Sequence, residues 1–320
     1  MKKHIICVFA MIGSFLLFVS GCSSNQGSDS TPAPVSVRNA TGWHIYSKSA
    51  SEISVKKPAG LAVNGKDVFI CDSDSNDIVQ LSPDLTFENS WGSLGNEPGN
   101  FIQPTDILIN ENKIYVLDAG NNRVQIFLHP DKVENTIPLF DYVPQNGDTY
   151  THLAVTHSGE LFVTTSALGD TDRVFLYNKD SREWDAVSDL YSCVTTQGDN
   201  VYAINTLEVT KKGKSVIAQS GSNSLYKYSS EHKCFEKEFE FPSMYTISDF
   251  VVTDDSIYVL SVYYKRLDRF DMTGMYQETI AEFDDADLFD LDTYLAIDDD
   301  GNFYVSDSRN GVLYKIVEET

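Results

Sequence analysis

A five-residue pattern that recurs six times limits the fold of this chain more than any other feature. Each copy has an apolar residue, then an aromatic one, and ends on Asp, Asn or a hydroxyl side chain. The copies are residues 68–72, 114–118, 161–165, 201–205, 257–261 and 303–307. Their aromatic residues are 46, 47, 40, 56 and 46 positions apart. A period of about 40–50 residues indicates one supersecondary unit per repeat, and such units bury their apolar faces against neighbouring copies.

Strand-like segments flank every copy. The preceding segments are 61–63, 107–109, 153–155, 194–196, 250–252 and 295–297. The following segments are 78–81, 124–127, 174–177, 225–228, 267–270 and 313–316. Apolar and polar residues alternate in them, and Asn, Asp and Gly separate them, as expected for antiparallel hairpins. The sequence therefore predicts an all-β, six-bladed β-propeller of four-stranded antiparallel blades.

Two segments depart from the simple repeat. The spacing of 56 follows the fourth copy, where residues 206–222 are predicted to form an extended hairpin inserted into the blade. The last copy runs out after three strands, and Trp43–Ser49 is strand-like without a partner. An open ring would leave two unpaired edges, so we expect Trp43–Ser49 to form the outer strand of the last blade.

The second copy carries the clearest resemblance to a known family. It reads Gly92-x-x-Gly95-x-x-x-Gly99-x-Phe101-x-x-Pro104-x-Asp106, then Ile114-Tyr115-Val116-x-Asp118-x-x-Asn121-Asn122-Arg123-Val124-Gln125-Ile126-Phe127. This segment resembles the NHL repeat. The resemblance implies a six-bladed propeller of the NHL or TolB-like kind over residues 41–320. It also implies a binding role, because most such propellers bind other molecules. A minority are enzymes, including an amidating lyase and, among look-alike propellers, metal-dependent lactonases.

The N-terminus has the pattern of an export signal. Lys2 and Lys3 precede an apolar run at residues 5–19, which is short for a membrane span and typical of a signal peptide. Val19-Ser20-Gly21-Cys22 then resembles the bacterial lipobox, which implies cleavage after residue 21 and lipidation of Cys22. Ordinary cleavage nearby, with an incidental cysteine, is the alternative. The expected organisation is a signal peptide at 1–21, a lipidated Cys22 with a flexible tether at 22–40, and the propeller at 41–320.

These features predict an extracytoplasmic protein held at the bacterial cell membrane or outer membrane by its lipid. The formal charge of −23 argues against binding to nucleic acid, or to an anionic membrane by charge, so the anchor is the only expected membrane contact. A monomer is expected. Cys71, Cys193 and Cys234 remain in the exported chain, and their odd number and scattered spacing predict three free thiols.

Alignment of the copies places one residue of each blade at the mouth of the central channel, where the innermost strands begin. These residues are Gly60, Asp106, His152, Cys193, Asp249 and Tyr294. Asp106, His152 and Asp249 have the side chains to hold a divalent cation or to act as acid and base. The alternative is that both aspartates bind loop amides. The sequence specifies no cofactor beyond this candidate cation.

The catalytic residues of these known enzymes are not matched in this sequence. The lactonases place a Glu among their channel ligands, and no Glu falls in the predicted ring. The lyase needs several metal-binding histidines, and His152 is the only one aligned to the mouth. Asp72, Asp118 and Asp307 recur at equivalent strand ends, which favours a repeated structural role in holding turns.

The predicted function is a non-catalytic module that binds a protein, peptide or glycan at the cell envelope. A metal-assisted lyase or hydrolase acting at the channel mouth is the alternative, and an architectural subunit of an envelope complex is a third. Tyr263 and Tyr264 lie in a predicted turn, and exposed aromatic side chains there would suit sugar or peptide binding.

Overall fold

Antiparallel sheets make up almost all the regular structure in a computed structural model of the chain. It describes residues 37–39, 42–129, 132–139, 149–166, 173–187, 204–210, 216–220, 224–241, 245–283 and 293–319. Within these ranges the only helix is the short 3-10 helix η1 (Ala119–Asn121). Short β-branched and aromatic runs between Gly, Asn and Asp turns account for this architecture.

Each sheet is a meander in which strands consecutive in the chain pair with each other. The first two sheets contain β3 (Pro58–Asn64), β4 (Asp67–Asp72), β5 (Asp77–Leu81) and β6 (Phe87–Trp91), then β7 (Pro104–Asn110), β8 (Lys113–Asp118), β9 (Arg123–His129) and β10 (Lys132–Pro138). The next two contain β11 (Thr149–Val155), β12 (Leu161–Ser166), β13 (Arg173–Asn178) and β14 (Glu183–Ala186), then β15 (Ile204–Val209), β16 (Val216–Ser220), β17 (Ser224–Ser229) and β18 (Cys234–Glu240).

The two remaining sheets each include a strand from the N-terminal region. One contains β19 (Ile247–Val252), β20 (Ser256–Ser261), β21 (Arg266–Asp271) and β22 (Tyr276–Phe283), with β1 (Val37–Asn39) at its edge. The other contains β23 (Thr293–Ile297), β24 (Phe303–Asp307) and β25 (Val312–Glu318), with β2 (Trp43–Ser49) at its edge. The prediction that Trp43–Ser49 pairs with the last strands is confirmed, with partners from Trp43↔Glu318 to Ser49↔Val312.

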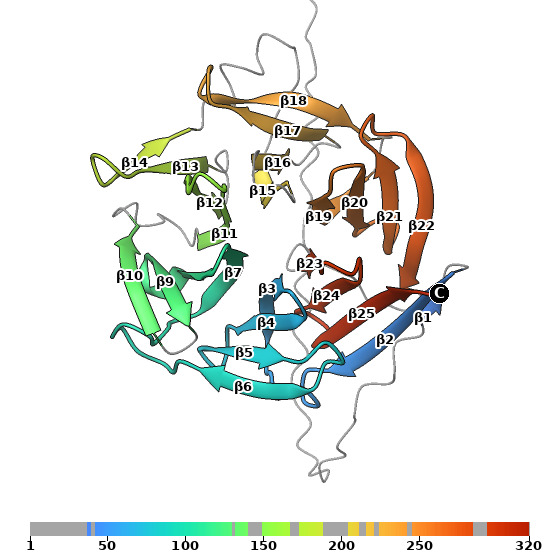
Figure 1. The fold of residues 1–320 in the computed structure, drawn as a ribbon, viewed down its shortest axis with the longest axis horizontal. Helices are drawn as coiled ribbons and strands as arrows, with labels where there is room; N and C mark the ends of the chain where they lie inside the picture. The colour runs from blue at the N-terminus through green and yellow to red at the C-terminus, as the bar shows by residue number, and fades with distance from the viewer. Residues whose placement is uncertain are drawn as a thin grey trace, which may run out of the picture. The chain divides into compact units, whose positions relative to one another are not determined.

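The sheets are arranged around a common centre, with the first strand of each meander innermost (Figure 1). Contacts link β3 to β7, β7 to β11, β11 to β15, β15 to β19, β19 to β23, and β23 to β3. The predicted all-β propeller of four-stranded antiparallel sheets is confirmed, and five sheets have four strands. The prediction of four strands throughout is wrong for the β19–β22 sheet, because β1 adds a fifth.

The N-terminal boundary of the folded part also differs from the prediction. The segment 22–40 is predicted as a tether, but Val37–Asn39 pairs with Ala281–Phe283 at the edge of β22. Three residues with no recurring pattern give no strand signal of their own, so only the exposed edge of β22 explains this pairing.

The fourth sheet is built from later residues than predicted. Ile204 and Asn205 belong to the innermost strand β15, and the predicted insertion at 206–222 supplies most of β15 and all of β16. The aromatic residue that marks the other second strands is absent here, because Ile217 holds that position opposite Glu208. The predicted innermost strand at 194–196 and Cys193 lie outside the described residues.

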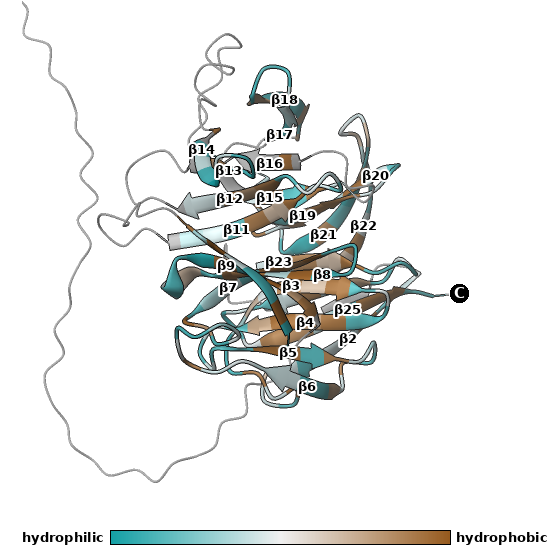
Figure 2. Cartoon of the chain, turned by 60° about the vertical axis from the view of Figure 1, so that its left-hand side comes forward, coloured by the Kyte–Doolittle hydropathy of each residue, from teal (hydrophilic) through white to brown (hydrophobic). Residues whose placement is uncertain are grey.

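The core lies between the faces of neighbouring sheets, where large aromatic side chains are fully buried. Tyr150, Phe162, Tyr226, Phe250, Tyr304 and Tyr314 are among them. In Figure 2 hydrophobic residues concentrate along the strands, and hydrophilic residues occupy many of the turns. Removal of these side chains from water is the main stabilising contribution, because no single sheet can bury both of its faces alone.

Two cysteines differ in their state. Cys71 is a free, buried thiol, as predicted. Cys234, the first residue of β18, is disulfide-bonded, so the prediction of three free thiols is wrong. The partner of Cys234 lies outside the described residues. No helix in the described ranges is long and apolar enough to cross a membrane.

A chain that begins at Pro58 should lose both N-terminal strands and expose the outer edge of β25. We expect its thermal unfolding to occur at a markedly lower temperature than that of a chain beginning at Val35, with aggregation through the unpaired edge. Calorimetry and light scattering measure both effects. A chain beginning at Gly42 is the control, because it lacks β1 and retains β2. Equal unfolding temperatures for the Pro58 and Val35 chains would contradict the closing role of β2.

Candidate functional site

Asp106 joins two neighbouring sheets through backbone hydrogen bonds. It follows a β-bulge in β7, where the pairing with β8 shifts register between Pro104 and Asp106. Its Oδ2 accepts a hydrogen bond from the Leu153 amide of β11 at 2.8 Å, and its Oδ1 accepts one from the Ile107 amide at 2.8 Å. The adjacent Thr105 hydroxyl donates to the Tyr150 carbonyl at 3.1 Å.

Asp249 repeats this arrangement between β19 and β23. Its Oδ2 accepts from the Leu295 amide at 2.7 Å, and its Oδ1 accepts from the Phe250 amide at 2.8 Å. The preceding Ser248 hydroxyl donates to the Thr293 carbonyl at 2.8 Å. The Thr206 hydroxyl of β15 is a third donor to this carboxylate, and it binds Oδ1 at 3.1 Å. A hydroxyl residue followed by Asp therefore forms the same inter-sheet connection twice.

The innermost position of these strands explains the connection. Each innermost strand pairs with its sheet on one side only, so the amides on its other side need different acceptors. The carboxylates of Asp106 and Asp249 supply acceptors to the next strand. The alternative in which both aspartates bind backbone amides is thus confirmed, although the amides belong to strands rather than loops.

The predicted ring of residues is mostly correct in register. Asp106, His152, Asp249 and Tyr294 are all buried. The rings of His152 and Tyr294 lie 5.6 Å apart between centroids. At Gly60 a Cβ atom would overlap the Asp106 backbone and lie 2.7 Å from Oδ1, so only glycine allows β3 and β7 this close. Asp106, His152, Asp249 and Tyr294 also line the central cavity, so a ligand mouth at this level stays a prediction.

The candidate cation ligands do not converge. His152 Nδ1 lies 3.9 Å from Asp106 Oδ2, which is beyond hydrogen-bond distance. Among the residues that the structure describes, no group of three or more His, Cys, Asp and Glu side chains is placed to hold a metal ion. Cys193 lies outside the described residues, and the equivalent register position in the fourth sheet belongs to Thr206.

A cavity of about 380 Å³ lies within the ring of innermost strands, and its lining includes the residues at the level of Asp106. It extends along these strands to the first hairpin turns, where Asn64, Glu111 and Asp299 are exposed. Six of its lining residues are acidic, and none is Lys or Arg: Asp106, Glu111, Glu208, Asp249, Asp298 and Asp299. Such a lining disfavours anionic ligands.

Glu208 is the functional candidate that sequence reasoning missed. It lies two positions after Thr206 in β15, where the other innermost strands carry only apolar residues: Ala62, Leu108, Ala154, Val251 and Ala296. The ring position of this strand is Thr206, so no Glu falls in the mouth ring itself, and Glu208 lies two positions further along β15. The signal was present in the sequence, because a correct register would have shown one carboxylate in an otherwise apolar ring.

Burial governs the protonation of these carboxyl groups. It raises the pKa of Asp106 to about 8, against the lowering effect of the Leu153 and Ile107 amides. It raises the pKa of Asp249 to about 7, against hydrogen bonds from Leu295, Phe250 and Thr206. The pKa of Glu208 is raised by burial first and then by the charges of Asp249 and Asp106. The cavity wall therefore carries less negative charge near neutral pH than its composition suggests.

The predicted turn anchors are confirmed. Asp72 accepts amide hydrogen bonds from Ser75, Lys56 and Lys57, and Asp307 accepts one from Asn310. Asp118 instead accepts from the Ile102 amide and from Arg123 Nε at 2.7 Å.

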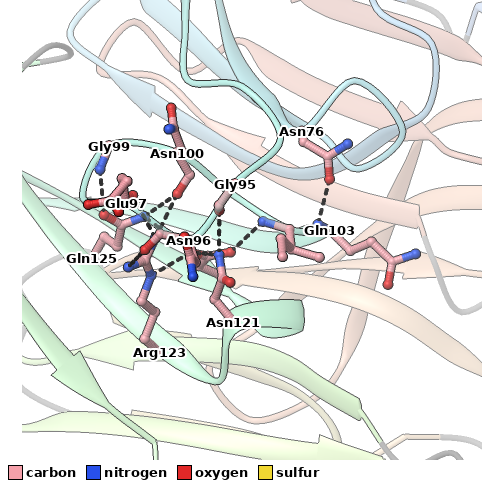
Figure 3. A network of polar contacts seen from close by, with 12 residues as sticks. Asn76, Gly95, Asn96, Glu97, Gly99, Asn100, Gln103, Asn121, Arg123 and Gln125 are labelled. Atoms are coloured by element: carbon pink, nitrogen blue, oxygen red, sulfur yellow. Dashed lines mark hydrogen bonds and ion pairs between the residues drawn. The ribbon is translucent and has the colours of Figure 1, made fainter.

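Arg123 continues this network into the loop that joins the first two sheets (Figure 3). Its guanidinium donates to the carbonyl oxygens of Asn96, Glu97 and Asn100. In the best-preserved repeat, Asp118 and Arg123 therefore stabilise the loop between the first two sheets.

Comparison with known proteins supports the fold. A family model of the NHL repeat matches residues 101–127, a segment that includes Asp118 and Arg123 of this network. No curated protein matches the chain. The structure resembles virginiamycin B lyase from Staphylococcus aureus, with 9% sequence identity, a TM-score of 0.57, and coverage of 86% of this chain and 99% of that one.

Two further solved structures are similar. One is a calcium-binding protein, regucalcin, from Agrobacterium tumefaciens, with 10% identity, a TM-score of 0.57, and coverage of 82% and 90%. The other is a protein of unknown function from Bacteroides thetaiotaomicron, with 12% identity, a TM-score of 0.61, and coverage of 86% and 76%. At these identities the likeness concerns the fold alone, and neighbours with different activities share it.

The raised pKa values predict that stability falls as pH increases. Asp106 and Asp249 titrate near 3.8 in the unfolded chain and at about 8 and about 7 in the folded one. Between these values the folded protein binds more protons, so the free energy of unfolding decreases from about pH 4 to about pH 8. Calorimetry at several pH values across this window measures the slope. The doubly substituted Asp106→Asn, Asp249→Asn chain should show a flatter slope, and an unchanged slope would contradict the assignment.

Proposed function

We propose that the chain is a lipid-anchored, extracytoplasmic β-propeller that binds a protein, peptide or glycan at the cell envelope without catalysing a reaction. One observation carries this proposal. Asp106 and Asp249, the carboxylates best placed for chemistry, accept backbone hydrogen bonds from the next sheet on both of their oxygens. Each of these carboxylates satisfies buried backbone amides on two strands, which is the role of a structural group.

A closed six-bladed ring is part of the proposal. The contact of β23 with β3 supports it, because it joins the last sheet to the first. The pairing of β2 with β25 supports it too, since β2 precedes β3 in the chain and completes the last sheet. In this reading the five-stranded sheet counts as one blade with an added edge strand, and the protein acts as a monomer.

The proposed location rests on the lipobox-like Val19-Ser20-Gly21-Cys22 and on one structural fact. Cys234 is disulfide-bonded, and disulfides persist in oxidising compartments outside the cytoplasm. The first strand begins at Val37, fifteen residues after Cys22. An extended chain of that length reaches at most about 50 Å, so the propeller would stay close to the membrane that holds its lipid.

A metal-assisted lyase or hydrolase is the second candidate, and Glu208 is the observation that favours it. This residue places a third carboxyl group on the cavity wall with Asp106 and Asp249. Carboxyl groups with raised pKa values in a cavity are frequent features of catalytic sites. Metal ligands must be deprotonated, however, so burial weakens this cavity as a cation site near neutral pH.

One experiment separates the two candidates. The purified protein, from Ser23 to its C-terminus, is titrated with peptide and oligosaccharide panels, and each bound ligand is recovered for mass spectrometry. We expect a ligand with a dissociation constant in the micromolar range or below, recovered unchanged, and binding that survives the Glu208→Gln and His152→Ala substitutions. Metal analysis of the same samples should find no stoichiometric ion. Conversion of the ligand that is lost in Glu208→Gln, or a stoichiometric metal that is lost with it, would contradict the binding role.

A further inference from the structure

Exposed hydrophobic side chains gather on one sheet of the propeller. Eight large hydrophobic residues are exposed among the described residues, and five of them belong to the β19–β22 sheet or its turns: Tyr263, Tyr264, Met272, Met275 and Tyr276. Isolated exposed hydrophobic residues are normal on a soluble protein, whereas a concentration of them on one element indicates an interaction site.

Two of these residues contact one guanidinium group, and a third packs against one of them. The rings of Tyr263 and Tyr264 meet at 90°, with centroids 5.0 Å apart, and form a corner at the β20–β21 turn. The Arg266 guanidinium lies over the Tyr264 ring at 4.7 Å and over the Tyr276 ring at 5.9 Å. Tyr263 is 56% exposed, Tyr264 38% and Tyr276 48%. We call Tyr263, Tyr264, Arg266 and Tyr276 the tyrosine patch.

The patch is held in place before any ligand arrives. The Tyr276 hydroxyl lies 3.0 Å from the Thr279 hydroxyl, which fixes the ring along β22. Tyr264 packs on the buried Tyr245 with centroids 5.0 Å apart, and its amide donates to the Ser261 hydroxyl. Rings that are already ordered lose little conformational entropy on binding, so less of the contact free energy is lost to ordering them.

The guanidinium of Arg266 is paired with a buried carboxyl group. Arg266 Nε donates to Asp268 Oδ2 at 2.6 Å, so a carboxylate balances the guanidinium charge. The side chain of Arg266 remains 28% exposed, and Asp268 is buried beneath it. The guanidinium has five N–H donors in a plane, and this ion pair uses one edge of that plane. The exposed part therefore offers hydrogen-bond donors without a net charge.

We infer that the tyrosine patch binds a neutral glycan, an inference that rests on the proposed binding function and narrows its ligand. The apolar C–H face of a sugar ring packs on an exposed tyrosine ring, and sugar hydroxyls accept hydrogen bonds from the guanidinium and the phenol groups. A formal charge of −23 repels anionic glycans at long range, and the balanced Arg266–Asp268 pair gives no compensating local attraction. The two ring sites on either side of Arg266 suit a chain of several sugars.

The test is calorimetric titration of the purified protein with soluble β-glucan and mannan oligosaccharides, uronic-acid oligomers and a peptide library. We expect a neutral oligosaccharide to bind, with an affinity that is unchanged by salt. Tyr263→Ala and Tyr276→Ala should each raise its dissociation constant at least about tenfold, while Tyr263→Phe keeps the ring and most of the affinity. Tyr46→Ala is the matched control, because Tyr46 is 52% exposed on β2 in a different sheet. Unfolding temperatures confirm that each variant folds.

Every outcome bears on the inference. Loss of neutral-glycan binding in both patch variants, with Tyr46→Ala unaffected, supports it. Binding of a neutral glycan that survives both substitutions, or a preference for uronic-acid oligomers, overturns it. Binding of peptides alone also overturns it but leaves the proposed binding function standing. If neither panel binds, the inference and the proposed function fail together.

Discussion

The unpaired side of each innermost strand is the constraint on which this structure depends. A propeller places the first strand of every sheet around a central space, and one side of that strand has no neighbour in its own sheet. At β11 and β23 the amides of Leu153 and Leu295 face away from their own sheet. They donate to the carboxylates of Asp106 and Asp249. An unsatisfied buried amide costs about 1–3 kcal/mol, so these side chains stabilise both the strand and the junction between sheets.

The same constraint explains why the ring residues have structural roles. The carboxylates lie where a catalytic site would be expected, yet their oxygens are engaged by the scaffold. His152 and Tyr294 fill the space beside them, and Gly60 lets β3 approach. At the level of Asp106 the cavity is therefore lined by buried side chains that belong to the scaffold. Ligand binding is left to the cavity near the first hairpin turns and to the outer surfaces of the sheets, where side chains are not needed for closure.

Much of the fold could be predicted from sequence, because period and alternation are properties of backbone pairing. The second strands of five sheets fall where their aromatic residues indicated, and Trp43–Ser49 pairs as its unpartnered pattern required. The fourth sheet was misplaced since Ile217 replaces the aromatic marker and residues 201–209 form one continuous strand-like run. That single error displaced the predicted ring residue and hid Glu208. Residue types could identify Asp106 and Asp249 as candidate site residues. Only the geometry shows that both oxygens of each accept hydrogen bonds from backbone amides.

Native-state hydrogen exchange of the Leu153 and Leu295 amides tests the central claim most directly. If Asp106 and Asp249 hold the next strand, both amides exchange as slowly as core strand amides in the unaltered protein. Exchange at Leu153 should then accelerate by at least about tenfold in Asp106→Ala, with Leu295 less affected, and Asp249→Ala should show the reverse. Fast exchange at these amides in the unaltered protein, or rates that the two substitutions leave unchanged, would contradict the account and return both carboxylates to the list of groups available for chemistry.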